Sequence, residues 1–257
     1  MMRLATGVKI NLGLRVLRRR PDGYHDIETL FYPCPAPGDR LEMQRARSFS
    51  LQIDGPCYTG WDPSEDLCAR AWRLMAGRYR IPPVEIRLHK TAPVGAGLGG
   101  GSADAAAVLC ALDALFTLHL GEDRLAALAA ELGSDCPFFV YNRPMLGEGR
   151  GEVLTPFALD LSAYDIRIAV PEGVSVSTAE AYRGVLDAAH PNPGLPLRHA
   201  LRRPVAEWRE VLHNDFEDTV FPRYEKIAAL KRRFYEQGAV YAAMSGSGSA
   251  VFGLFPR

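Results

Sequence analysis

The stretch PVGAGLGGGSADAA, residues 93–106, carries five glycines within seven positions: Gly95, Gly97, Gly99, Gly100 and Gly101. Glycine adopts positive φ and lets a ligand approach the main chain closely. Successive backbone N–H groups in such a loop can converge on an anion, and a helix that starts directly afterwards adds its positive N-terminal end. The sequence therefore predicts a phosphate-binding loop, with the Ser102 hydroxyl beside it. A flexible loop or a close helix contact is the alternative.

Two ionisable residues outside this stretch have the chemistry of phosphoryl transfer to an alcohol. Asp135, in LGSDCPFF, could accept the hydroxyl proton as a catalytic base. It could equally cap a helix, because Pro137 and a run of apolar and aromatic residues follow closely. Lys9 lies in a predicted strand of alternating apolar residues, and the residues alone favour a lysine on an edge strand with its ammonium in water. A role for Lys9 in stabilising an ionised Asp135 or in offsetting charge on a transferring group needs a family resemblance as its support.

Periodic patterns in the first half of the chain predict strands followed by helices. Apolar residues alternate with polar or small ones in the strands, and alanine and leucine dominate the helix after the glycine stretch. The predicted strands cover residues 8–14, 27–32, 39–43 and 84–88. The predicted helices cover residues 64–79, with Ser64 as N-cap, 102–120 and 123–132. The glycine stretch therefore leads from a strand towards a helix, as a phosphate-binding loop requires.

The segment YNRPMLGEGRGEVLTP, residues 141–156, is rich in glycine and proline and is the predicted junction between two domains, residues 1–152 and 153–257. Beyond it the predicted strands are residues 166–170, 239–244 and 250–255, and the last two flank SGSGS. The predicted helices are residues 178–189, 205–212 and 224–236. Residues 191–204 are predicted to be a proline-containing loop.

The pattern of glycines narrows the kind of phosphate site. Gly95, Gly97 and Gly100 satisfy G-x-G-x-x-G, the dinucleotide-binding pattern. A dinucleotide turn, however, follows directly on a strand, and here residues 90–93 intervene. A predicted helix begins near Glu122, where a strand ending in a ribose-binding carboxylate would be needed. The pattern G-x-x-x-x-G-K-[ST] is absent, so the residues favour a phosphate cradle of another kind.

The stretch PVGAGLGGGSADAA resembles the phosphate-binding motif of the GHMP kinases, the superfamily of galactokinase, homoserine kinase and mevalonate kinase. SGSGSAVFGLF, residues 245–255, resembles the C-terminal glycine motif of that superfamily. VKINLGLRVLRRRPDGYHDIETLF, LGSDCPFF, EGRGEVLTP and VSTAEAY resemble segments of one family within it, the 4-diphosphocytidyl-2-C-methyl-D-erythritol kinases. The resemblance is weakest from about residue 188 to 208. It implies an α+β, two-domain GHMP kinase fold, with an N-terminal domain like ribosomal protein S5 domain 2 and a ferredoxin-like C-terminal domain.

The resemblance also implies a reaction. ATP would phosphorylate the 2-hydroxyl of 4-diphosphocytidyl-2-C-methyl-D-erythritol, in the non-mevalonate pathway to isoprenoid precursors. Asp135 would be the general base and Lys9 the catalytic lysine. Mg²⁺ is expected to arrive with ATP, held mainly by phosphates and water, because the sequence shows no metal cage.

The nucleotide-binding residues follow from the same resemblance. The glycine motif implies contacts to ATP from Pro93, Val94, Gly95, Ala96, Gly97, Leu98, Gly99, Gly100, Gly101, Ser102 and Ala103. Lys90 matches a lysine near the nucleotide, and a solvated strand end is the alternative. Asp66 falls where the family often has an asparagine that faces the nucleotide, so this chain departs from the pattern there.

The substrate-binding residues begin at a Pro-Asp-Gly turn. The resemblance implies that Tyr24 stacks on the cytosine of the substrate, that His25 hydrogen-bonds it, and that Tyr182 lies on the opposite face. Two aromatic side chains around one base form a stacking platform worth roughly 1–3 kcal/mol per contact. Asn11 matches a residue near the transferred group, and Thr178 matches a polar residue that lines the same site. Without the resemblance, Tyr24 and His25 would be polar aromatic residues on an exposed loop.

The composition limits partners and compartment. Lys+Arg and Asp+Glu each number 30, and zero net charge argues against a general nucleic-acid-binding protein. Five cysteines without a C-x-x-C pair argue against a zinc site or a disulfide framework and fit a reducing cytoplasm. MMRLATGVKINLGLRVLRRR lacks signal-peptide features, and no run of about 18 apolar residues predicts a membrane span. We expect a cytoplasmic enzyme, a monomer or weak homodimer, that acts on a small molecule with a cytidine diphosphate group.

Other interpretations remain open at this point. The chain could be another superfamily kinase such as homoserine kinase, a dinucleotide-dependent oxidoreductase, or a non-catalytic nucleotide-binding module. The Asp-Gly-Tyr-His turn and Tyr182 argue against the first, because a substrate without a base gives no reason for an aromatic pair. The basic run Arg18, Arg19 and Arg20 is either a solvated hairpin end or an attraction for the anionic diphosphate.

Overall fold

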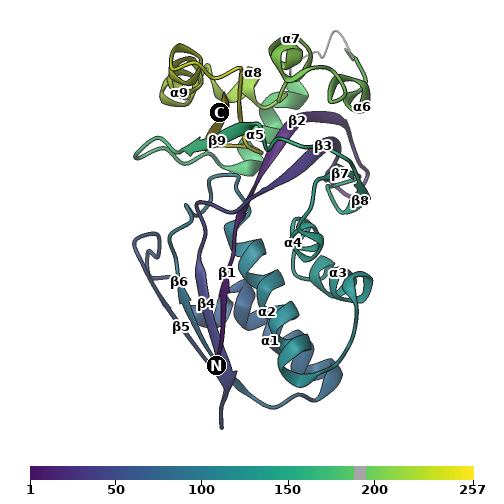
Figure 1. The fold of residues 1–257 in the computed structure, drawn as a ribbon, viewed down its shortest axis with the longest axis vertical. Coiled ribbons are helices and arrows are strands. Elements are labelled where there is room, and N and C mark those ends of the chain that lie inside the picture. The colour runs from purple at the N-terminus through teal and green to yellow at the C-terminus, as the bar shows by residue number, and fades with distance from the viewer. Residues whose placement is uncertain (188–194) are drawn as a thin grey trace. The chain divides into compact units, whose positions relative to one another are not determined.

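The computed structural model describes residues 1–187 and 195–257, and the chain forms two compact units (Figure 1). Unit 1 consists of Met1–Lys9, Pro33–Val94 and Gly99–Arg143, and unit 2 of Ile10–Tyr32, Gly95–Leu98 and Pro144–Arg257. The sequence predicted a single boundary, after residue 152. The units are instead discontinuous, because the long N-terminal hairpin joins a sheet whose other strands lie after residue 143.

Unit 1 contains a four-stranded sheet, in the order β1 (Met2–Ala5), β4 (Arg40–Arg45), β6 (Val84–His89) and β5 (Ser50–Asp54). β1, β4 and β6 pair antiparallel, whereas β5 runs parallel to β6. β6 shows the predicted alternation, since Val84, Ile86 and Leu88 are buried and Arg87 and His89 are exposed. The edge strands β1 and β5 were not predicted, because neither contains a buried residue and the apolar signal is weak.

The helices of unit 1 are α1 (Leu67–Tyr79), α2 (Gly100–Phe116), α3 (Glu122–Ala130) and α4 (Cys136–Tyr141), with a 3-10 turn, η1 (Pro63–Glu65), before α1. α1 and α2 lie side by side (Figure 1). Together with the sheet they bury Met75, Val108 and Leu112 in one apolar core. The three long helices were predicted from their periodicity. α4 entered the sequence analysis only as the alternative in which Asp135 caps a helix, because six residues are too few to show a helical period.

The start of α1 differs from the predicted start. Ser64 was predicted to be the N-cap, but it lies inside η1, whose own cap is Asp62. Asp66 caps α1 instead, and its Oδ1 accepts a hydrogen bond from the Cys68 N–H at 2.8 Å. Pro63 explains the separate turn, because its fixed φ suits a helical first position and it needs no N–H partner there.

Unit 2 contains two sheets. The first has the order β2 (Val8–Arg19), β3 (His25–Cys34), β7 (Met145–Glu148) and β8 (Val153–Pro156). β7 and β8 form an antiparallel hairpin within the segment that the sequence presented as a domain junction. Gly149 and Gly151 have φ of 69° and 104°, so these glycines make the turn of the hairpin. The second sheet is antiparallel, in the order β10 (Tyr241–Met244), β11 (Val251–Pro256) and β9 (Tyr164–Ala169).

The helical segments of unit 2 are α5 (Thr178–Asp187), α6 (Leu197–Ala200), η2 (Val205–Glu207), α7 (Trp208–Val211), α8 (Glu217–Val220) and α9 (Glu225–Glu236). α5 and α9 match predicted helices, although residues 188 and 189 of the first lie outside the described residues. The predicted helix 205–212 is divided into η2 and α7. The predicted loop 191–204 contains α6, and its residues 191–194 lie outside the described part. None of the described helices is long and apolar enough to cross a membrane.

A buried asparagine, Asn214, holds the turn between β10 and β11. Its Nδ2 donates hydrogen bonds to the carbonyl oxygens of Met244 and Gly246, each at 2.8 Å, and its Oδ1 accepts one from the Phe216 N–H at 3.0 Å. The side chain is fully buried. Buried main-chain groups need hydrogen-bond partners, and the Asn214 side chain supplies a partner to three of them.

Replacing Asn214 with alanine is expected to lower the free energy of unfolding by about 2–4 kcal/mol, because three buried groups lose a hydrogen-bond partner. Urea unfolding would measure the loss. His213→Ala is the control, since the neighbouring side chain is half exposed and bonds Asp218 at the surface. It should change stability by no more than about 0.5 kcal/mol. Equal stability of the two variants would contradict this role of Asn214.

Candidate active site

Lys9 and Asp135 form an ion pair in unit 1, with Lys9 Nζ 3.5 Å from Asp135 Oδ2. Lys9 lies on β2 and is 4% exposed, whereas the Asp135 side chain, directly before α4, is 32% exposed. Burial lowers the pKa of Lys9, and the Asp135 carboxylate opposes that change. The alternative that Lys9 holds its ammonium in water at a strand edge is therefore wrong. The pair combines a buried cation with a carboxylate that solvent or a ligand can reach.

The Asp135 carboxylate does not cap α4. Asp135 occupies the N-cap position, but its side chain makes no capping hydrogen bond. Its φ of −84° and ψ of −17° are helical, whereas a capping residue is normally extended. The residue directly before α4 is thus oriented by its ion pair with Lys9, and the carboxylate is available for chemistry.

The start of α2 lies beside this ion pair. Gly99 is the N-cap of α2, with φ of 72°, and the helix begins at Gly100, two residues before the predicted start. A Cβ on Gly99 would lie 2.9 Å from Cε2 of Phe139 and 3.4 Å from Cγ of Lys9. Only glycine fits this close approach. The N-terminal end of α2, with its unpaired N–H groups and positive dipole, is therefore next to the Lys9 side chain.

The preceding loop residues, 95–98, are held by the C-terminal glycine turn, residues 245–249, within unit 2. Ala250 N–H donates a hydrogen bond to the Ala96 carbonyl, and the Ser245 hydroxyl donates one to the Gly97 carbonyl, both at 3.0 Å. Gly97 has φ of 79°, and a Cβ there would overlap the Ser245 carbonyl oxygen. Gly95 has a similar φ, 70°, but a Cβ there would have no other atom within 4 Å, apart from its chain neighbours. The two glycine motifs thus pack backbone to backbone.

Lys90 is buried, with 2% of its surface exposed. Its ammonium donates hydrogen bonds to the carboxylates of Asp39 and Asp104, the latter at 2.6 Å. Burial would lower the pKa of Lys90, but the two carboxylates outweigh it and raise that pKa. The alternative of a solvated strand end is therefore wrong. Asp39 and Asp104 were not singled out from the sequence, because only the folded chain brings them to Lys90.

Asp66 is engaged locally. One carboxylate oxygen caps α1, and the other accepts a hydrogen bond from the Trp61 indole N–H at 3.0 Å. Trp61 in turn packs edge-on against Tyr58. The departure from asparagine at this position therefore places a carboxylate, rather than an amide, between a helix start and an aromatic pair.

Two of the predicted substrate residues contact the C-terminal glycine turn. Asn11 is buried and donates a hydrogen bond to the Thr29 hydroxyl at 3.1 Å, and its Oδ1 lies 3.4 Å from the Ser245 hydroxyl, whose hydrogen it can share with the Gly97 carbonyl. The hydroxyl groups of Thr178 and Ser247 lie 3.0 Å apart. The turn therefore connects the phosphate loop to both residues within unit 2, a role that its sequence did not reveal.

The aromatic residues predicted to bind the base all lie in unit 2, but within the residues that the structure describes Tyr182 pairs with His25 and not with Tyr24. The rings of His25 and Tyr182 are stacked, with centroids 4.5 Å apart, and Tyr182 packs edge-on against Phe216. His25 Nε2 is buried and has no hydrogen-bond partner in the described part of the chain. Tyr24 is 57% exposed, with the Arg150 guanidinium 4.8 Å from its ring centroid. Burial and the Arg19 charge lower the pKa of His25, which favours a neutral imidazole.

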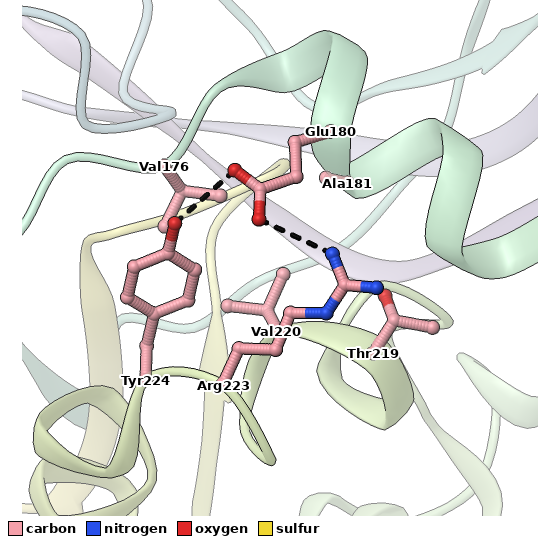
Figure 2. A pocket seen from close by; sticks show the side chains of 7 residues that line it. All are labelled: Val176, Glu180, Ala181, Thr219, Val220, Arg223 and Tyr224. Carbon is pink, nitrogen blue, oxygen red and sulfur yellow. Dashed lines mark hydrogen bonds and ion pairs between the residues drawn. The ribbon is translucent and has the colours of Figure 1, made fainter.

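Helix α5, which carries Thr178 and Tyr182 on one face, is anchored through Glu180. Figure 2 shows the Glu180 carboxylate accepting hydrogen bonds from the Arg223 guanidinium and the Tyr224 hydroxyl, both at 3.2 Å. These residues line a small pocket together with Val176, Ala181, Thr219 and Val220. The contact fixes α5 against the α8–α9 region.

The basic run pairs mostly with its own hairpin. Arg18 and Arg20 both form ion pairs with Asp26, and Arg20 also pairs with Asp22. This arrangement supports the hairpin-end interpretation for these two side chains. No group of three or more His, Cys, Asp or Glu side chains that could hold a metal ion occurs among the described residues.

Known proteins match this chain over most of its length. The GHMP kinases N terminal domain matches residues 66–143, and the GHMP kinases C terminal domain matches residues 197–257. A 4-diphosphocytidyl-2-C-methyl-D-erythritol kinase of Bacteroides thetaiotaomicron is 47% identical, over 96% of this chain and 89% of that protein. A crystal structure of 4-(cytidine 5'-diphospho)-2C-methyl-D-erythritol kinase is 36% identical, with a TM-score of 0.82, over 98% of this chain and 90% of that chain. This chain belongs to the 4-diphosphocytidyl-2-C-methyl-D-erythritol kinase family.

Family membership settles the class of enzyme. The chain is an ATP-dependent small-molecule kinase with the α+β, two-domain GHMP kinase fold, as predicted. The oxidoreductase alternative is wrong. A homoserine kinase of Cytophaga hutchinsonii is 18% identical with a TM-score of 0.57, and this similarity shows a common fold alone.

Gly97→Ala is expected to destabilise the kinase by at least about 2 kcal/mol more than Gly95→Ala. Both residues have positive φ, so both variants carry the left-handed penalty of about 1–2 kcal/mol. Only at Gly97 does the added methyl group overlap a carbonyl oxygen, that of Ser245. Urea unfolding without nucleotide would compare them, and equal losses would contradict the close packing of the two glycine motifs.

Proposed function

We propose that this kinase transfers the γ-phosphoryl group of ATP to the 2-hydroxyl of 4-diphosphocytidyl-2-C-methyl-D-erythritol, in the non-mevalonate pathway to isoprenoid precursors. The observation that carries the proposal is the Lys9–Asp135 pair beside the N-terminal end of α2. The printed names of the relatives supply the substrate. The five free cysteines fit a reducing compartment, and we place the kinase in the cytoplasm.

The phosphate loop, residues 93–103, is suited to the ATP phosphates. Gly95, Gly97 and Gly99 have positive φ, which exposes main-chain N–H groups that a side chain would cover. The first turn of α2 adds unpaired N–H groups and the positive end of the helix dipole. We assign the γ-phosphate to this end of the loop, because Lys9 lies beside Gly99 there.

The proton of the alcohol goes to Asp135. As the bond forms between the substrate oxygen and the γ-phosphorus, the bond from that phosphorus to the β-phosphate oxygen breaks, and ADP leaves. The Asp135 carboxylate accepts the hydroxyl proton, while Lys9 holds the carboxylate in place and balances charge on the phosphoryl group. Mg²⁺ bound to ATP would supply further charge neutralisation, held by phosphates and water because no acidic cluster among the described residues offers a cage.

The cytosine is held by the aromatic residues. Its ring would stack on Tyr182 or Tyr24, and the buried Nε2 of His25 supplies a hydrogen-bonding atom that the described residues leave unsatisfied. Asn11 and Thr178 would contact the erythritol portion, since both are positioned by the C-terminal glycine turn. These assignments account for the aromatic residues, which an amino-acid or mevalonate substrate would not need.

Asp135→Asn is expected to reduce ADP formation from Mg-ATP and 4-diphosphocytidyl-2-C-methyl-D-erythritol by about 10²–10⁴-fold, the contribution of a positioned base. The amide keeps the size of the side chain but cannot accept the proton. A coupled ADP-release assay measures the rate, and ADP titration calorimetry should show nearly unchanged nucleotide affinity.

Asp160→Asn, a change of an exposed carboxylate outside this account, is the matched control and should retain the native rate. If native, folded protein releases no ADP above background with this substrate but does so with homoserine or mevalonate, the proposed substrate is wrong. If Asp135→Asn retains the native rate, Asp135 is not the base.

Tyr182→Leu is expected to raise the KM for the cytidine substrate about 5- to 100-fold, the equivalent of roughly 1–3 kcal/mol of lost stacking. Leucine keeps apolar contact with Phe216, and the KM for ATP should stay within about twofold of native because the nucleotide does not need this ring. Tyr79→Leu, the same change in unit 1, is the control. An equal rise of both KM values in Tyr182→Leu would argue for general disruption instead.

A further inference from the structure

Thr6, Asp39, Lys90 and Asp104 form a buried polar network in unit 1, and each is at most 6% exposed. Lys90 donates hydrogen bonds to both carboxylates. The Thr6 hydroxyl donates to Asp104 Oδ1 at 2.9 Å and accepts from the Asp39 N–H at 3.2 Å. Four segments that are distant in the sequence therefore meet at one ammonium: the end of β1, the residue before β4, the end of β6 and the first turns of α2.

This network forms hydrogen bonds with the residues that precede the phosphate loop and with the helix that follows it. On the entry side, Asp39 Oδ1 accepts hydrogen bonds from the N–H groups of Thr91 and Ala92, at 2.6 and 2.7 Å. On the exit side, Asp104 belongs to α2, which begins at Gly100. Both ends of the loop are thus tied to the same Lys90 ammonium.

Gly100 shows how closely the two ends approach. A Cβ at this position would lie 3.2 Å from Cβ of Ala92, 3.8 Å from Oδ2 of Asp39 and 3.9 Å from Nζ of Lys90. The first residue of α2 therefore packs directly on the network and on the last residues before the loop. Any loosening of the network changes the separation of the loop ends, and with it the direction of the loop N–H groups.

We propose that Asp39, Lys90 and Asp104 are positioning residues for the nucleotide: they act on the ATP phosphates through the two ends of the phosphate loop, without touching them. The inference rests on the proposed function. It gives Lys90 a different role from a direct nucleotide contact, and it adds two carboxylates, Asp39 outside the glycine motif and Asp104 within it.

The two carboxylates differ in what an amide can replace. The Asp39 carboxylate accepts hydrogen bonds from the Lys90 ammonium with one oxygen and from the N–H groups of Thr91 and Ala92 with the other. An asparagine at 39 has only one oxygen, so its NH₂ group would face one of these two sets of donors and could not accept from it. An asparagine at 104 can direct its oxygen to Lys90 and its NH₂ group to the Thr6 hydroxyl, which then accepts this hydrogen bond instead of donating it. The same charge change therefore removes the bonds to Lys90 or to the loop N–H groups at position 39, whereas at position 104 it keeps the bond to Lys90 and reverses only the bond to Thr6.

The charge of the network depends on pH. Burial raises the pKa of Asp104 to about 7, while Lys90 opposes and Asp39 reinforces this rise. The titratable groups near Asp104 also include the Cys68 thiol of α1, whose pKa burial raises well above its usual range. Above the Asp104 pKa the two carboxylates outnumber the single ammonium, and below it the charges balance. A net negative charge next to the two ends of an anion-binding loop disfavours phosphate binding.

The test is ADP binding by calorimetry, together with KM values for ATP and for the cytidine substrate, in full-length variants. Asp39→Asn should weaken ADP binding and raise the KM for ATP about tenfold, with the KM for the cytidine substrate within about twofold of native. Asp104→Asn should bind ADP within about threefold of native at pH 6 and should lose the native decline in affinity between pH 6 and 8. Met75→Ala, a core change in the same unit, controls for stability.

Thr6→Val provides a milder variant if Asp39→Asn does not fold, and it should weaken ADP binding in the same direction by a smaller factor. The proposal is overturned if Asp39→Asn and Thr6→Val bind ADP as native protein does, or if Met75→Ala at equal loss of stability weakens ADP binding as much. If native protein binds ADP but does not phosphorylate the cytidine compound, the proposed substrate is wrong. The comparison of ADP binding between native protein and the variants still tests the role of the network. Native protein that binds no ADP contradicts both proposals.

Discussion

A buried ammonium beside a single, partly exposed carboxylate underlies the proposed chemistry. Removing a lysine from water is costly unless a negative charge compensates, and Asp135, 3.5 Å from Lys9, provides that charge. The carboxylate keeps an exposed side, so it can meet an alcohol while Lys9 fixes its position. Gly99 follows from the same constraint, because the Lys9 stem and Phe139 fill the space that a Cβ would need. Helix α2, which we propose to bind phosphate, therefore starts beside the lysine that holds the proposed base.

Bare backbone binds phosphate well only if something else keeps it in place. Glycine loses more conformational freedom on folding than other residues, so a loop of glycines must be fixed by its surroundings. Within unit 2, Ser245 and Ala250 hold the carbonyls of Gly97 and Ala96. Within unit 1, the buried network ties Thr91 and Ala92 to α2. Each unit thus supports its own part of the loop with polar contacts that are already satisfied before a nucleotide binds.

Local patterns in the sequence were sufficient for the long helices, the strand β6 and the glycine motifs, because periodicity and composition are local properties. They were insufficient where a short signal had two meanings. Gly149 and Gly151 belong to a hairpin turn, although a glycine-rich segment is equally typical of a junction. Ser64 and Asp66 are both plausible caps, and the 3-10 turn that Pro63 starts decides between them.

The resemblance supplied the candidate site residues, but the sequence did not show which of them contact one another. The residues alone left Asp135 open between base and cap and favoured an exposed Lys9, because the two meet only in the folded chain. Lys90 was noticed as a loop neighbour, yet Asp39 lies in no motif, and Asp104 lies in the glycine motif without any sign that it contacts Lys90. Likewise, SGSGS was visible as a glycine motif, but its contacts to Asn11, Gly97 and Thr178 depend on the antiparallel pairing of β10 with β11.

The most direct test of the account is the position of the transferred phosphoryl group. Native kinase would be incubated with Mg-ATP and 4-diphosphocytidyl-2-C-methyl-D-erythritol, and the product examined by ³¹P NMR with proton and carbon correlation. The account predicts one new phosphomonoester resonance coupled to the carbon that bears the 2-hydroxyl, with the diphosphate signals intact and one ADP formed per product. A phosphate on another hydroxyl, or ATP consumption without any phosphorylated cytidine product, would contradict it.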